Sequence, residues 1–315
     1  MNKFKTLLLA HHGGDNHVIR LAVKQFSENV AQRTGGQIAI AIIPNSSLGN
    51  VSELLRLVMD GTADMGLPPI EWLAQHAPKF GCVLAPFVFD DYAHADRLLD
   101  GEFKAWALPE LDALGIVFLG GWEWGFRQIS NCLHPILRPE DIRGLRIRVP
   151  PVPPYRAVIV AFGGIPVMID FSRFASVLGQ GLVDGQENPV AVYCSLGLQF
   201  DQKFLSLLNY SYGTLGHVIN SNCFKRLTVE QQGILCEESL KAGLLMRQLL
   251  REQEAEQLVA LASQGVRIDR PDPAPFKAMM QPVYRELGAS LGAENMRAFM
   301  AMVDRQRKAG ERVFA

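Results

Sequence analysis

Two segments of the chain carry residues whose types and spacing suit carboxylate binding. The first is Gly144–Pro150, and the second, Val183–Pro189, follows after a predicted helix. Alternate side chains of a strand share a face, so Arg146 and Arg148 are expected opposite their apolar neighbours. Arg148 comes at the strand's carboxyl end, where ligands bind in open α/β sheets. With Asn188 it predicts an anion site, although most strand arginines are simply exposed to solvent.

Composition limits the class of protein. A chain of 315 residues corresponds to about two domains. Its 48% hydrophobic and 20% charged residues are typical of a globular protein. The formal net charge is −1 and the basic residues are scattered, so we expect no nucleic acid partner and no attraction to anionic membranes. A negatively charged ligand has to be captured locally.

Targeting and redox features are sparse. No apolar run approaches the roughly 20 residues of a membrane-spanning helix, so no stable membrane insertion is expected. Met1–Ala10 has a basic onset, but its apolar run is too short for a signal peptide, and a buried first strand explains it better. The five cysteines are widely spaced without a Cys-x-x-Cys pair. An odd thiol mildly favours a reducing compartment, but buried cysteines also occur in periplasmic proteins.

The apolar pattern alternates between strand and helix periods. Val18, Ala22, Phe26 and Val30 recur at helical spacing, and a capping-box pattern before Val51 predicts another helix start. This order is typical of crossovers in a parallel sheet. The predicted strands are Thr6–Ala10, Gln37–Ile43, Ala63–Met65, Ile116–Leu119, Arg127–Ser130 and Leu145–Val149, and the predicted helices are Val18–Val30, Val51–Asp60, Tyr155–Phe162, Thr228–Gln264 and Phe276–Arg307. A second α/β unit is expected from about Trp122, and Thr228–Gln264 is long enough to be bent or broken.

The ordered motifs resemble the extracytoplasmic solute-binding proteins of tripartite ATP-independent periplasmic (TRAP) transporters, the C4-dicarboxylate-binding type, over essentially the whole chain. No single motif carries the resemblance; their order does. The matching segments are Phe26–Val30, Thr34–Gly36, Pro44–Gly49, Gly61–Met65, Pro86–Phe89, Gly125–Arg127 with Asn131, Gly144–Pro150 and Val183–Pro189.

This resemblance implies an α/β, two-lobed, periplasmic-binding-protein-like fold. Each lobe would hold a mixed sheet flanked by helices, with a long helix spanning both. One lobe would comprise residues 1–123 and about 209–248, the other 124–208 and about 249–315, with the ligand cleft between them. The protein would capture a small organic acid by closure and deliver it to TRAP membrane subunits in the periplasm.

The resemblance also assigns site residues. Arg148 matches the main carboxylate anchor, Arg127 a second arginine contact, and Asn188 an amide that helps hold the carboxylate. Arginine suits this role because its planar fork meets both carboxylate oxygens. Phe171 matches an aromatic position that packs over the ligand.

Each of these residues also has a structural interpretation. Arg127 would form an ordinary ion pair with Glu123. Asn188 before a proline would be a turn residue. Phe171, between strand and helix, would belong to the core.

A histidine-rich loop, His11–His17, follows the first predicted strand. Imidazoles with a carboxylate can bind zinc, but the spacing fits no standard zinc pattern, so no metal is expected. We interpret the loop as cleft rim, with His12 and Asn16 near the ligand. Glu71 and Trp72 follow the third strand and are expected in the same cleft, where an acid would select ligands that carry a hydroxyl or amine.

Departures from the family pattern bear on the ligand. Arg173 and Ala175 stand where glutamate and tyrosine are usual, Trp124 replaces a common asparagine, and Tyr210 a common histidine. More aromatic surface and fewer polar groups suggest a carboxylate with an apolar or aromatic body. Trp124 and Tyr210 are therefore expected to contact the ligand.

An α/β enzyme is the alternative from another class. The dinucleotide-binding, Walker and nucleophile-elbow motifs are absent from the sequence, so neither catalysis nor a cofactor is expected. A sensor or capture protein without a transporter is the other alternative. The carboxylate-binding transport receptor is the function that the sequence favours.

Overall fold

Residues 5–177 and 180–313 are described by a computed structural model, and the chain divides into two units. Unit 1 comprises Met1–Ala77, Lys104–Trp124 and Thr214–Arg251, and unit 2 comprises Pro78–Phe103, Gly125–Gly213 and Glu252–Ala315. Unlike the lobes expected from the sequence, this division places residues 78–103 and 209–213 in unit 2 and Trp124 in unit 1.

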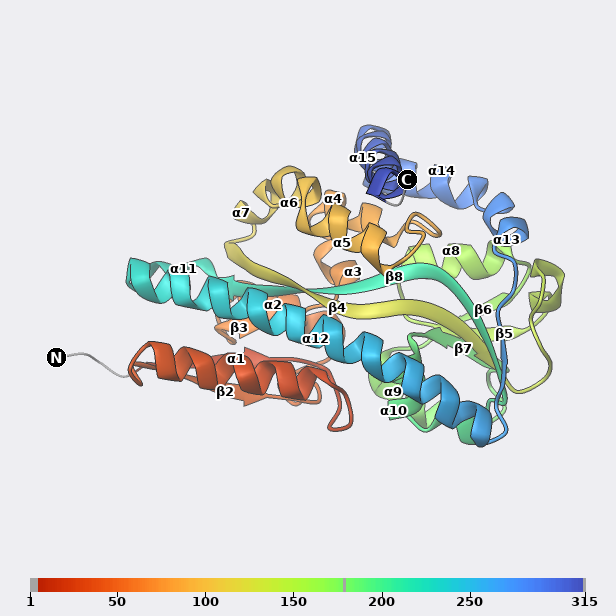
Figure 1. Ribbon diagram of the computed structural model, residues 1–315, viewed down its shortest axis with the longest axis horizontal. Helices are drawn as coiled ribbons and strands as arrows, with labels where there is room; N and C mark the ends of the chain where they lie inside the picture. The colour runs from red at the N-terminus through yellow and green to blue at the C-terminus, as the bar shows by residue number, and fades with distance from the viewer. Residues whose placement is uncertain (1–4, 178–179, 314–315) are drawn as a thin grey trace. The chain divides into compact units, whose positions relative to one another are not determined.

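Unit 1 is built on parallel strands. Strand β1 (Lys5–Ala10) pairs in parallel with β2 (Ile38–Ile43) and with β3 (Met65–Gly66), and β3 pairs antiparallel with β8 (Phe204–Asn220). Helix α1 (Ile19–Arg33) lies against β2 with its apolar face buried, as its four-residue spacing predicts (Figure 1). The other elements are η1 (Val51–Glu53), α2 (Leu54–Met59), α3 (Ile70–Leu73), α7 (Pro109–Asp112) and α11 (Ser221–Lys225).

Unit 2 continues with mixed pairing. Strand β7 (Gly185–Asn188) pairs antiparallel with the end of β4 (Ile116–Asn131) and in parallel with β5 (Arg146–Val149), which pairs in parallel with β6 (Ile165–Met168). The other elements are α4 (Pro78–Gly81), η2 (Cys82–Leu84), α5 (Tyr92–Asp100), η3 (Pro139–Ile142), α8 (Pro153–Ala161), α9 (Phe171–Val177), α10 (Val190–Ser195), η4 (Leu198–Phe200), β9 (Arg267–Asp269), α13 (Ala274–Ala278), α14 (Gln281–Leu291) and α15 (Ala293–Val313). Helices α4, α5, α14 and α15 pack together (Figure 1).

Long elements run through both units. Strands β4 and β8 and helix α12 (Val229–Ser263) each begin in one unit and end in the other, whereas α6 (Glu102–Ala107) only crosses a boundary. The predicted spanning helix is therefore present. It is one continuous helix of 35 residues, so of the two expectations, broken or bent, the break is wrong and the bend stays a prediction.

Three local predictions also differ from the structure. The two strands predicted within 116–130 are one strand, because Gly120 continues β4: a Cβ there would lie 2.8 Å from Oγ of Ser239, so glycine permits close packing rather than a turn. The single helix predicted for Phe276–Arg307 is three helices, and Gly292, with φ of 94°, ends the second. Strand β8 was not predicted, since its buried Ser206 and Ser211 obscure the apolar pattern. The capping box of Asn50 and Glu53 is confirmed.

Replacing Gly185 with alanine tests the close approach of β7 to β4. The added Cβ would lie 2.3 Å from the carbonyl oxygen of Ser130 and 2.9 Å from Cβ of Asn131. We expect the free energy of unfolding to fall by about 1–3 kcal/mol or more, measured by chemical denaturation. Gly233→Ala in α12 is the matched control, because nothing lies within 4 Å of its Cβ, and it should be neutral or stabilising. Equal stability of the two variants would contradict this packing.

Candidate anion-binding site

Three neighbouring strands of unit 2 bring the predicted anion-binding residues together. Strand β7 lies between β4 and β5, so that Glu187 is in register with Ile129 and Gln186 with Arg148. Arg127 lies two residues before Ile129 on β4. The pairing therefore places both arginines and the segment around Asn188 in adjacent strands.

Arg148 is buried, with 1% of its surface exposed. Its Nε and Nη2 donate to the carbonyl oxygen of Ile169 at 2.9 and 2.6 Å, and its guanidinium lies 4.4 Å from the ring centre of Phe174. These contacts hold the group in place and leave Nη1 without a hydrogen-bond partner in the described chain. No carboxylate among the described residues forms an ion pair with Arg148.

The electrostatics of Arg148 reflect this missing carboxylate. Burial lowers its pKa to about 10; Glu187 opposes that shift, Arg127 adds to it, and the exposed Asp170 opposes it weakly. At neutral pH the group is still a cation. An unpaired buried cation is costly, and an anion that binds beside it relieves that cost.

Arg127, in contrast, already has an anionic partner. Its Nε and Nη2 donate to the two carboxylate oxygens of Glu187, at 2.7 Å for Nη2, and Nη2 also donates to the Glu187 carbonyl at 3.0 Å. The predicted alternative, a pair with Glu123, is wrong: that carboxylate accepts from Nη2 of Arg251 at 2.6 Å. Burial by itself would lower the pKa of Arg127, but Glu187 holds it well above its usual value.

Tyr210 closes the same ion pair from β8. Its buried hydroxyl donates to the Glu187 carboxylate, and burial followed by that carboxylate raises the tyrosine pKa well above its usual value. The ring of Tyr155 lies under the Arg127 guanidinium at 4.3 Å. The expected ligand contact of Tyr210 stays a prediction, and its hydroxyl is committed to Glu187.

Asn188 belongs to a buried chain of amides and a hydroxyl. Its Nδ2 donates to Oε1 of Gln186 at 2.6 Å, and Gln186 donates to Oγ of Ser130 at 2.8 Å. Oδ1 of Asn188 accepts weakly from Nη2 of Arg127 at 3.4 Å. Asn188 ends strand β7 and is 4% exposed, so it is more than a turn residue.

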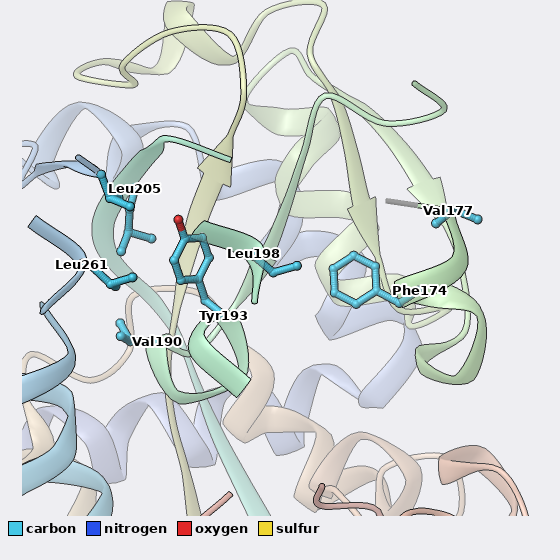
Figure 2. Packing of buried hydrophobic residues seen from close by; sticks show 8 residues of the cluster. Phe174, Val177, Val190, Tyr193, Leu198, Leu205 and Leu261 are labelled. Carbon is cyan, nitrogen blue, oxygen red and sulfur yellow. The ribbon is translucent and has the colours of Figure 1, made fainter. Parts of the chain in front are cut away.

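The aromatic ring over Arg148 belongs to Phe174. It lies in a buried cluster with Tyr193 and Leu198 (Figure 2). Phe171, the aromatic chosen from the sequence, packs half-buried against the same cluster, which agrees with its structural interpretation. Helical spacing places Phe171 and Phe174 on one face of α9. The side chain of Ala175 lies outside the part that the structure describes.

In unit 1 the predicted rim residues form an aromatic stack. The ring centre of Trp124 lies 4.4 Å from that of His17, with the rings stacked, and 4.5 Å from that of His12, with the rings tilted. Burial lowers the pKa of both histidines to about 3, with neighbouring histidines adding to the shift. Both rings are therefore neutral at physiological pH and present apolar faces to the indole.

The remaining predicted residues of unit 1 are Asn16, exposed before α1, Glu71, half-buried in α3, and Trp72, buried beside it. No cluster of metal-binding side chains occurs within residues 5–177 and 180–313. Glu187, Tyr155 and Phe174 were not assigned to the site from the sequence. Glu187 lies inside the segment Val183–Pro189 and directly precedes Asn188. This position next to a predicted ligand contact was the signal that could have identified it.

Comparisons with known proteins agree on one family. The sequence model described as bacterial extracellular solute-binding protein, family 7, matches residues 9–290. The 2,3-diketo-L-gulonate-binding periplasmic protein YiaO of Escherichia coli K12 is 32% identical over 248 residues, which cover 79% of this chain and 76% of that protein.

Solved structures agree with the sequence match. A TRAP periplasmic solute-binding protein from Roseobacter denitrificans with bound β-D-glucuronate has a TM-score of 0.90 and 27% identity, covering 95% of this chain and 99% of that one. Another, from Polaromonas sp. JS666 and bound to D-erythronate, has a TM-score of 0.88 and 27% identity, covering 94% and 98%. The predicted α/β periplasmic-binding-protein fold is confirmed. No helix among the described residues is long and apolar enough to span a membrane.

Arg127→Met tests the ion pair with Glu187. Removing the cation leaves a buried carboxylate without its main partner, so we expect the free energy of unfolding to fall by about 3–5 kcal/mol. The double variant Arg127→Met/Glu187→Leu removes both charges and should recover most of that loss in the same denaturation measurement. A single variant as stable as the wild type would contradict the pair.

The buried histidines predict an acid-sensitive unit 1. The folded-state pKa is about 4 for His11 and about 3 for His12 and His17, against roughly 6.5 when unfolded. Below about pH 6.5 the unfolded chain binds more protons than the folded chain. The free energy of unfolding therefore falls as the pH is lowered, by up to about 1.4 kcal/mol per pH unit for each histidine. Denaturation at about pH 7 and 5.5 should show this loss, and His17→Gln should reduce it. Equal loss in that variant would exclude His17 as a source.

Proposed function

Since the chain belongs to bacterial extracellular solute-binding protein family 7, we propose that it captures a small hydroxylated organic acid through a carboxylate bound at Arg148. The single observation that carries the proposal is the buried Arg148 guanidinium, which contacts a carbonyl oxygen and an aromatic ring but forms no hydrogen bond or ion pair with a described carboxylate. Every other buried ionic side chain described in unit 2 is already paired.

The proposed contacts would account for useful affinity. Each charge-assisted hydrogen bond to a carboxylate contributes roughly 1.5–3 kcal/mol net. Hydrogen bonds to the ligand from Arg148 and from the amide of Asn188 would supply much of the about 8 kcal/mol that corresponds to micromolar binding. The second arginine, Arg127, would add to this. Because Nε and Nη2 of Arg127 already bind Glu187, we propose that Arg127 contributes to the ligand mainly through Nη1 and its charge.

Relatives support a hydroxylated acid. The Escherichia coli relative is named for 2,3-diketo-L-gulonate, and the two similar structures hold β-D-glucuronate and D-erythronate. Unit 1 contains an aromatic stack of Trp124 with His12 and His17. The expected ligand contacts of His12 and Trp124 stay predictions. The roles of Asn16, Glu71 and Trp72 stay predictions.

Transport is the proposed use of this binding. Solute-binding proteins of this family work with TRAP membrane subunits, and we propose delivery to such a permease in the periplasm. A ligand that prefers the closed state shifts the protein toward it, which makes capture and release controllable. A binding protein of this family needs no turnover, so we propose that the chain is not an enzyme. Nothing in the comparisons favours a sensor without a transporter.

Arg148→Met tests the proposal with Arg146→Met as a matched control. Arg146 precedes it by two residues on β5 but is 43% exposed and pairs with Asp184. By isothermal titration with D-erythronate, D-glucuronate and L-galactonate, we expect Arg148→Met to lose roughly 10- to 100-fold in affinity for whichever acid binds, since a charge-assisted bond of about 1.5–3 kcal/mol is removed. Arg146→Met should bind like the wild type.

The melting temperature distinguishes a ligand-binding role of Arg148 from a structural one. Arg148→Met removes a buried cation that has no ionic partner, so its melting temperature without ligand should be unchanged or higher. A large loss of stability with intact binding would show that Arg148 is structural and would contradict the proposal.

A further inference from the structure

Strand β8 is irregular at Asn209, directly before Tyr210. Asn209 has a φ of 49°, in the left-handed region, and it is exposed between the buried Leu208 and Tyr210. Few residues other than glycine adopt this conformation, and asparagine is among those that tolerate it best. A left-handed residue interrupts a strand and can re-aim the side chain beside it. The side chain that follows here is Tyr210, whose hydroxyl donates to Glu187.

Gln128, on the adjacent strand β4, stabilises this left-handed residue. Its Oε1 accepts from the backbone N–H of Asn209 at 2.9 Å, and its Nε2 donates to Oδ1 of Asn209 at 2.6 Å. The Asn209 N–H thus bonds to a side chain, as expected where the pairing of two strands is interrupted. Gln128 is fully buried, and its Nε2 also donates to the Phe126 carbonyl at 3.3 Å. The irregular point of β8 is therefore fixed to β4.

A second left-handed residue, Phe87, holds the backbone of Tyr210. Phe87 has a φ of 56°, which is a rare conformation for a bulky side chain. Its N–H donates to the Tyr210 carbonyl at 2.7 Å, and the carbonyl of the same peptide group, on Pro86, accepts from the Tyr284 hydroxyl at 2.7 Å. The rings of Phe87 and Tyr210 meet edge to face, with centres 6.5 Å apart.

Unfavourable backbone conformations gather at one residue of unit 2. Of the four non-glycine residues with positive φ among the described positions, Phe87 and Asn209 both contact or adjoin Tyr210. Such conformations persist where the surrounding contacts enforce them, and they concentrate at functional sites. Asn209 restrains Tyr210 on its nitrogen side, and Phe87 restrains it at its carbonyl.

We infer that Asn209 is a positioning residue: its left-handed backbone, held by Gln128, directs the Tyr210 hydroxyl at Glu187. A hydroxyl in this place helps to hold the Glu187 carboxylate on Arg127. The inference rests on the proposed function only for its effect on ligand binding, since the placement of the hydroxyl is a property of the protein without ligand.

Tyr210→Phe removes only the hydroxyl, so its effect measures how well that hydroxyl is placed. In the otherwise wild-type protein we expect it to lower the equilibrium constant of folding at least about tenfold, because a hydrogen bond to a buried carboxylate is lost. Asn209→Ala has lost the amide that favours the left-handed backbone, so in this variant Tyr210→Phe should lower the constant by about threefold or less. Chemical denaturation of the four proteins measures both effects.

Asn209→Gly and Asn45→Ala are the matched controls. Glycine adopts the left-handed conformation without an amide, so Tyr210→Phe should again lower the folding constant at least about tenfold in Asn209→Gly. Asn45 is also a left-handed asparagine, with a φ of 57°, but it follows β2 in unit 1. In Asn45→Ala the full effect of Tyr210→Phe should therefore remain, which separates placement of the hydroxyl from a general loss of stability.

An equal effect of Tyr210→Phe in Asn209→Ala and in the wild type would overturn the inference. So would an effect in Asn209→Gly or in Asn45→Ala that is reduced as far as in Asn209→Ala.

Binding is measured separately, by calorimetry with D-erythronate, D-glucuronate and L-galactonate. For the acid that the wild type binds best, Asn209→Ala should weaken the affinity at least about threefold, and Asn209→Gly should not. An unchanged affinity in Asn209→Ala would overturn the effect on binding. Failure of all three acids to bind the wild type contradicts the proposed function and leaves the inference to the folding measurement, which needs no ligand.

Discussion

Two guanidinium groups are buried with a single carboxylate, and the rest of the site depends on which of the two arginines that carboxylate pairs with. Glu187 is held by Arg127 and Tyr210, so Arg148 has only the carbonyl oxygen of Ile169 and the face of Phe174. A carbonyl dipole and a ring fix a guanidinium in place but do not neutralise it. Arg148 is therefore held in place without an anionic partner, so at the proposed site little ordering would remain when a carboxylate binds.

Strand pairing explains why Glu187 pairs with Arg127 and not with Arg148. Strand β7 lies between β4, which carries Arg127, and β5, which carries Arg148. Gly185 lets β7 approach β4 closely enough for Glu187 to reach Arg127. The aromatic stack of Trp124 with two neutral histidines supplies surface of a different kind in unit 1. Unit 2 thus holds the charged cluster, and unit 1 holds an apolar stack.

Much of this arrangement was predictable from the sequence, and the exceptions have physical reasons. Period-two alternation around Arg148 and helical spacing in α1 report local geometry, and both were interpreted correctly. The partner of Arg127 was not, because Glu123 is near in sequence whereas Glu187 is brought near only by strand pairing. Phe171 was chosen because it matches the aromatic position of the family; Phe174 shares its helix face, and tertiary packing decides which ring meets Arg148. Strand β8 was missed because buried serines interrupt its apolar pattern.

A crystal structure of the protein with its bound acid tests the central claim most directly. The account predicts a carboxylate oxygen within hydrogen-bonding distance of Nη1 of Arg148, with the Arg127–Glu187 pair intact and no second anion beside it. A ligand carboxylate held elsewhere, with Arg148 still bonded only to Ile169, would contradict the claim that the unpaired arginine is the anchor.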